Sequence, residues 1–211
     1  MTDVAFSWDR SARAVLADAL ARLDVRRFVV EIRPGELAIA RVGRLRHDPG
    51  GRHVLAGCGT ALSAAWIVLR GLGIRPVLSF PHDPGRPDVL AAVTPGADDP
   101  ATVSDWDRYL ALRAVAGPPR GRAVPVADPG VLAALAGENP WPRTEVTRHA
   151  TSRGLEVVAD GAGCVDRVLV GAAVHSVRVA AAVRGLTTEV RPGGQGSAPQ
   201  AVVLVFEGTR L

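Results

Sequence analysis

Two stretches of small residues, 52–72 and 165–186, constrain the fold of this chain more than any other feature. In each stretch Gly and Ala recur beside Leu or Val at helical spacing, which predicts two long helices that pack closely against their neighbours. Both stretches close with Arg-Gly-Leu, and a separation of 114 residues aligns these motifs and also aligns Gly57 with Gly171. We therefore hypothesise that a helix–strand unit is duplicated, although the Ala- and Gly-rich composition would itself produce part of the match.

Shorter elements are predicted around these two helices. Asp128 is expected to cap a helix that has Pro129 at its first position, and Ser104 is expected to cap another. Pro34-Gly35 separates two alternating apolar runs and predicts a β-hairpin. The periodicity places helices at about 8–24, 104–115 and 128–135, strands at 27–33, 36–41, 74–80, 89–93, 155–159 and 201–206, and leaves 144–152 ambiguous, with a helix as one interpretation.

The composition predicts one folded domain. With 47% hydrophobic residues among 211, the chain can bury a substantial core. We expect a first half at about 1–116 and a second half at about 117–211. The longest apolar run, 61–69, contains Ser63 and ends at Arg70, so no transmembrane segment is expected. The N-terminus does not show the basic and then apolar pattern of a signal peptide, so a cytoplasmic location is the expectation.

The charged residues, the cysteines and the histidines indicate which partners and ligands are not expected. The net charge of +4 comes from Arg alone, since the sequence has no Lys, and the basic residues are scattered among acidic ones. With one Tyr and four Phe there is no basic stripe interleaved with stacking aromatics, so nucleic acid is not an expected partner. Cys58 and Cys164 stand alone, and the five His residues form no pair at metal-binding spacing, so no metal site is expected. His175 is interpreted as a hydrogen-bonded core or interface residue.

A series of motifs in the first half points to a family. The motifs are Asp48–Arg52, Leu55–Leu62, Leu69–Pro76 and Asp83–Ala91. In this order they resemble the Acg family of actinobacterial nitroreductase-like proteins. The resemblance covers about 15–95 well and 160–207 weakly, the latter through Gly171–Val174 and the closing Ala198–Leu204.

The resemblance implies a fold, a cofactor and an activity. The fold would be a nitroreductase-like α+β sandwich, with a central, mostly antiparallel sheet flanked by helices and with two related halves. FMN would lie between the halves, and the flavin would carry hydride from NAD(P)H to a small organic acceptor. No protein side chain is assigned a catalytic role. A homodimer is expected, because small units of this type complete their core and pocket across a two-fold interface.

The flavin site itself departs from the family pattern. Where the family has a Pro-Ser-x-x-Asn-x-Gln-Pro-Trp stretch, this chain reads Ala21–Phe28, without Asn, Gln, Pro or Trp. Guanidinium groups suit a flavin phosphate because they donate paired, charged hydrogen bonds. The candidates for phosphate binding are Arg120, Arg122 and Arg113, and then Arg26 and Arg27. The alternative for each is an ordinary solvated surface arginine.

Three functional hypotheses follow. The first is an FMN-dependent oxidoreductase. The second is an inactive family member that sequesters flavin, binds another small molecule or serves as a structural partner subunit. The lost polar residues of the flavin loop motivate the second. A less favoured third is a biosynthetic flavoenzyme that dehydrogenates or reduces a modified peptide or metabolite.

Overall fold

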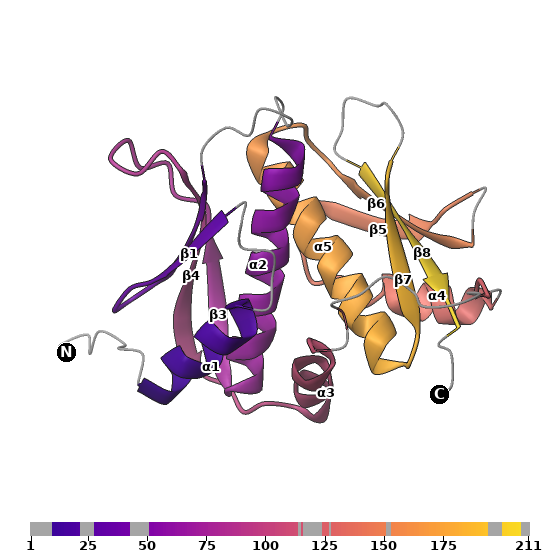
Figure 1. Ribbon diagram of the computed structural model, residues 1–211, viewed down its shortest axis with the longest axis horizontal. Helices are drawn as coiled ribbons and strands as arrows, with labels where there is room; N and C mark the ends of the chain where they lie inside the picture. Colours follow the sequence, from indigo (N-terminus) through magenta and orange to yellow (C-terminus); the bar gives the residue numbers. More distant parts are fainter. Residues whose placement is uncertain are drawn as a thin grey trace.

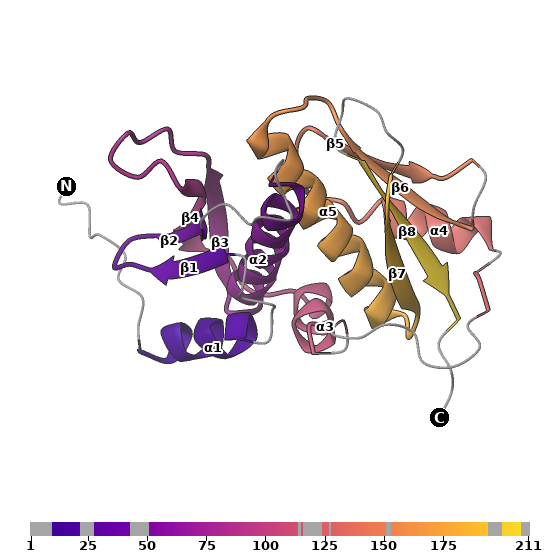
Figure 2. The same ribbon diagram turned by 45° about the horizontal axis from the view of Figure 1, so that its top comes forward.

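The fold is a sandwich in which two β-sheets enclose two long helices (Figures 1 and 2). The computed structural model describes residues 10–21, 28–42, 51–113, 115, 124–126, 128–150, 153–193 and 200–207. Its helices are α1 (Arg10–Ala21), α2 (Arg52–Gly71), α3 (Val103–Ala111), α4 (Pro129–Ala136) and α5 (Cys164–Val183). Its strands are β1 (Phe28–Ile32), β2 (Leu37–Arg41), β3 (Ile74–Ser79), β4 (Val89–Asp98), β5 (Thr144–Arg148), β6 (Gly154–Ala159), β7 (Thr187–Pro192) and β8 (Gln200–Phe206).

The two sheets are antiparallel and have the same strand order. One is ordered β1-β2-β4-β3 and the other β5-β6-β8-β7. In each half a short helix, a hairpin, a long helix and a second hairpin follow one another, and α3 stands between the halves. The expected α+β class is therefore confirmed. The expected single central sheet is not found in the described part of the chain, because each sheet packs on its own long helix and the two long helices pack on each other.

The contact between α2 and α5 is exceptionally close, as the small residues of both helices predict. A Cβ atom added to Gly59 would lie 2.0 Å from the backbone oxygen of Val168. One added to Gly171 would lie 2.4 Å from the backbone oxygen of Ala56. The helices run side by side in the same direction (Figure 1), and one continuous core joins residues of both halves.

The two long helices match at a different separation from the one that the motifs predict. Gly59 faces Gly171, and Ser63 contacts His175 across 112 residues, not 114. Gly73 and Gly185, which follow the two helices, both have left-handed backbone angles, with φ of 75° and 69°. The Arg-Gly-Leu motifs align Gly71 with Gly185, whereas the structure aligns Gly73 with Gly185. The glycine with the left-handed backbone follows the motif in the first half and lies inside it in the second, which accounts for the difference of two residues.

The structure settles one ambiguous segment and corrects one helix cap. Residues 144–148, for which a helix was one interpretation, form a strand, since Thr144 to Arg148 pair in antiparallel register with β6. Thr102, not Ser104, caps α3: its hydroxyl accepts from the Asp105 backbone N–H, and Asp105 in turn accepts from the Thr102 N–H. The capping of α4 is confirmed, with the Asp128 carboxylate accepting from the Gly130 N–H at 2.8 Å.

Helix α2 is long and apolar enough to cross a membrane by length and composition. It is the one such helix among the residues that the structure describes. The protein itself buries 72% of its most apolar stretch, as expected for the core helix of a folded domain. The expectation that the chain has no transmembrane segment stays a prediction, because the core helix of a folded domain passes the same test of length and composition.

Candidate functional site

Of the five arginines proposed for phosphate binding, the structure describes only Arg113. Arg113 is exposed just after α3, and its backbone N–H donates to the Leu110 oxygen at 3.4 Å. Its side chain does not line the pocket described below. Arg26, Arg27, Arg120 and Arg122 lie outside the described residues.

The space between α2 and α5, where the resemblance would place FMN, is filled by the helices themselves. Their backbones touch at Gly59 and Gly171, and apolar side chains fill much of the contact on either side. An isoalloxazine ring does not fit between helices in backbone contact. The flavin position implied by the family resemblance therefore disagrees with this structure.

A buried polar network lies further along the same helix contact. The Ser63 hydroxyl is 3.0 Å from His175 Nδ1 and 3.0 Å from the Ser176 hydroxyl. The Trp141 indole N–H donates to Ser176 at 2.8 Å. Ser63 and His175 are 0% and 3% exposed, so a substrate cannot reach this serine–histidine pair. Its role is to satisfy polar groups within the core.

Burial also controls the charge of the histidine in this network. Desolvation, with a smaller contribution from the positive charge of Arg178, lowers the pKa of His175 from 6.5 to about 3. His175 is therefore neutral at physiological pH. The interpretation of His175 as a hydrogen-bonded core residue is confirmed.

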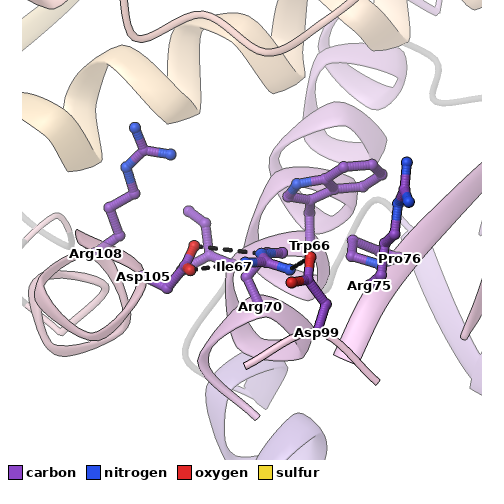
Figure 3. Close-up of a pocket in the computed structure, with 8 residues that line it drawn as sticks. All are labelled: Trp66, Ile67, Arg70, Arg75, Pro76, Asp99, Asp105 and Arg108. Carbon is purple, nitrogen blue, oxygen red and sulfur yellow. Dashed lines mark hydrogen bonds and ion pairs between the residues drawn. The ribbon is translucent and has the colours of Figure 1, made fainter. Parts of the chain in front are cut away.

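An accessible pocket lies where α2, β3 and α3 meet (Figure 3). Its volume is about 370 Å³, within the range of known ligand sites. It is lined by Trp66, Ile67, Arg70, Arg75, Pro76, Asp99, Asp105 and Arg108. Three guanidinium groups, two carboxylates and an apolar wall thus share one small space.

Arg70 and two aspartates form the fixed part of this pocket. The Arg70 guanidinium donates to Asp99 at 2.5 Å and to Asp105 at 2.9 Å. Burial alone would raise the pKa of Asp105, but hydrogen bonds from Arg70 and Thr102 outweigh it and hold the pKa at about 2. Asp105 is therefore ionised at neutral pH, and the charge of Arg70 is already compensated.

Arg108 belongs to a second ionic cluster. Its guanidinium donates to the Glu138 carboxylate, which also accepts from Arg184 at 2.8 Å. Burial alone would raise the pKa of Glu138, but the hydrogen bonds from Arg184 and Arg108 outweigh it and lower the pKa. The Glu138 carboxylate therefore pairs with two guanidinium groups at once.

Arg75 differs from the other two arginines. It is exposed on β3, and no ion pair to a carboxylate is found for it in the described part of the chain. Figure 3 shows Arg75 and Arg108 on either side of Trp66, both extending away from the two aspartates. Trp66 is held in place by an edge-to-face contact with Trp141, with ring centroids 5.4 Å apart. The pocket therefore offers an uncompensated cation beside a fixed aromatic ring.

This pocket was not predicted from the sequence. In the sequence Arg70 is distinguished only as the residue that ends an apolar run and begins the Arg-Gly-Leu motif. The available signal was the spacing of Trp66 and Arg70, since residues four apart lie on the same face of a helix. The contribution of β3 and α3 depends on tertiary contacts, which leave no local pattern in the sequence.

Comparisons with known proteins assign no family to the chain: no family model matches it, and no curated protein shows significant similarity. Within the described residues, no group of three or more His, Cys, Asp or Glu side chains could hold a metal ion. The α2–β3–α3 pocket is therefore the feature from which a function can be argued.

Proposed function

We propose that the chain is a small-molecule binding protein and that its site is the α2–β3–α3 pocket. The ligand is an anion that carries a planar, apolar part. Arg75 is the observation that carries the proposal, because an arginine without a carboxylate partner beside a fixed tryptophan offers both a charged hydrogen bond and a stacking surface. Ile67 and Pro76 complete the apolar wall.

The charge of the pocket supports an anionic ligand. Arg70 is compensated by Asp99 and Asp105, whereas Arg75 adds a positive charge that no described residue balances. In a partly enclosed site such a charge acts more strongly than on an open surface, because water screens it less. An anion placed at Arg75 also avoids the two aspartates, from which this side chain points away (Figure 3).

Two flavins provide a direct test, since FMN and riboflavin differ by one phosphate group. We expect FMN to quench tryptophan fluorescence on binding and riboflavin to bind more weakly. In Arg75→Ala the difference between them should shrink, because the lost charged hydrogen bond is worth about 1.5 to 3 kcal/mol. Arg148→Ala, an exposed arginine on β5, is the matched control. Equal binding of FMN by wild type and Arg75→Ala would contradict the proposal.

Flavin-dependent catalysis is the second candidate. We propose it as an Acg-like activity in which FMN passes hydride from NAD(P)H to a small organic acceptor in the cytoplasm. Its structural support is the cationic, aromatic pocket, because the contact between α2 and α5 leaves no room for the ring. An absorbance spectrum of the purified protein tests it, and a colourless protein that also fails to take up added FMN would contradict it.

The relation between the two halves is also a proposal. Their shared order of elements, and the meeting of equivalent residues across α2 and α5, support a duplicated unit. In this arrangement the second half supplies the helix that a partner subunit would supply in a dimer. The homodimer hypothesis therefore draws its support from the family resemblance, and sedimentation equilibrium measures it directly.

A further inference from the structure

Helix α3 joins the two halves through ion pairs on one of its faces. Asp105 and Arg108 are three residues apart, so they project from the same side of the helix. Asp105 binds Arg70 of the first half, at the end of α2. Arg108 binds Glu138 of the second half, which also holds Arg184 just after α5. We call these two sets of contacts the α3 clamp.

Charge contributes much of what holds α3, because little of the helix is buried. Ala111 is its one buried residue. Val103, Trp106 and Leu110 are 79%, 49% and 64% exposed. Tyr109 packs against Gly71 of the first half, and Ala111 belongs to an apolar cluster with Ile67 of α2 and Val179 of α5. Attachment to the second half therefore combines this small apolar contact with the contact of Arg108 with Glu138.

Arg108 is shared between the clamp and the pocket. Its guanidinium has several N–H donors but a single positive charge. An anion that reaches Arg108 from the pocket would lower the attraction of Arg108 for Glu138, because both anions then share one positive charge. We infer that a ligand in the pocket and Glu138 compete for Arg108, so that binding loosens α3 from the second half. This inference rests on the proposed function, since it requires an anion in that site.

Thermodynamic reciprocity predicts the direction in which each substitution changes ligand affinity. If the ligand weakens the Arg108–Glu138 contact, then weakening that contact must strengthen ligand binding by the same factor. Removing the charge of Glu138 should therefore raise affinity. Removing Arg184 should lower it, because Glu138 then interacts with Arg108 alone.

The experiment measures FMN affinity in Glu138→Gln and Arg184→Gln, with Glu145→Gln on β5 as an exposed control. We expect FMN to bind about fivefold more tightly to Glu138→Gln, more weakly to Arg184→Gln, and unchanged to Glu145→Gln. Amide hydrogen exchange of 103–111 in wild type should also become faster at saturating FMN.

The opposite outcomes separate this inference from the proposed function. FMN binding that is the same in wild type, Glu138→Gln and Arg184→Gln, with unchanged exchange in α3, would overturn the competition and leave the binding site standing. Absence of FMN binding in all variants would overturn both. If Glu138→Gln does not fold, Arg184→Gln decides alone, since tighter binding there contradicts the competition.

Discussion

The Ser63 hydroxyl lies 3.0 Å from His175 Nδ1, and these two residues occupy the same position in the two long helices. They are 112 residues apart in the sequence, and the same separation relates Gly59 to Gly171 and Ile67 to Val179, which also meet in pairs. Positions 112 residues apart therefore contact one another along α2 from Gly59 to Ile67. Such a contact line is what a two-fold axis running between α2 and α5 would produce.

The neutral His175 makes stability depend on pH. Because its pKa is about 3 when folded and near 6.5 when unfolded, the unfolded chain binds the extra proton between these values. Stability should therefore fall as pH falls below 6.5, by up to a tenfold change in the unfolding equilibrium for each pH unit. Urea denaturation between pH 7 and pH 4.5 measures this slope.

A matched variant identifies the histidine as the cause. His175→Gln keeps a hydrogen-bonding group near Ser63 but does not titrate, so its stability should change less over this interval. The interval also lies above the range in which Asp105 and Glu138 are protonated, because both have lowered pKa values. Parallel pH profiles for the wild type and the variant would show that His175 does not control the slope.

The backbone contact at Gly59 should tolerate no side chain. In Gly59→Ala the added Cβ would lie 2.0 Å from the Val168 oxygen, so the long helices must move apart. We expect a loss of about 3 kcal/mol in the free energy of unfolding, at the upper end of overpacking effects. Gly35→Ala is the control, because nothing lies within 4 Å of its added Cβ. Similar denaturation midpoints for the two variants would contradict this close approach.

The sequence predicted the helices and most strands correctly because their signals are local. The small-residue pattern of 52–72, the cap at Asp128 and the hairpin turn at Pro34-Gly35 all depend on neighbours along the chain. The segment 144–152 stayed ambiguous because a short segment with mixed periodicity acquires its strand conformation from pairing with β6. The layer order was also missed, since nothing local distinguishes a sheet flanked by helices from helices flanked by sheets.

The candidate site is formed by ion pairs between residues far apart in the sequence, so local sequence patterns could not predict it. Arg70 reaches Asp99 and Asp105 across 29 and 35 residues, and Glu138 joins Arg108 and Arg184 across 30 and 46. In an Arg-rich sequence, charge alone does not indicate which arginine lacks a partner. Arg75 becomes distinctive only when the others are seen to be paired.

The Arg70–Asp105 contact should contribute measurably to stability. Asp105→Asn removes a charged hydrogen bond to Arg70 in a mostly buried setting, so we expect a loss of about 1 to 3 kcal/mol at neutral pH. The pKa of Asp105 falls from 3.8 to about 2 on folding, so this stabilisation is present above pH 3.8 and lost as pH falls toward 2. Denaturation at pH 7 measures the loss of stability in Asp105→Asn, and denaturation at pH 2.5 measures how far this difference from the wild type shrinks.

Asp107 provides the control within the same helix. It is exposed, and it does not belong to the α3 clamp. Asp107→Asn should therefore change stability by less than about 0.5 kcal/mol. If the two asparagine variants are equally stable at pH 7, the contact between Arg70 and Asp105 does not hold α3.

The two cysteines should differ sharply in reactivity. Cys58 is fully buried in α2, and desolvation raises the pKa of its thiol to about 12, so almost no thiolate forms at neutral pH. Cys164 is exposed at the first residue of α5. We expect Ellman's reagent at pH 8 to modify one thiol per folded chain and two in guanidinium chloride. Cys164→Ser should remove the fast reaction and leave the slow one, which then reports how often the contact between the long helices opens. Fast modification of two thiols in the folded wild type would show that Cys58 is accessible and that the α2 core is not closed.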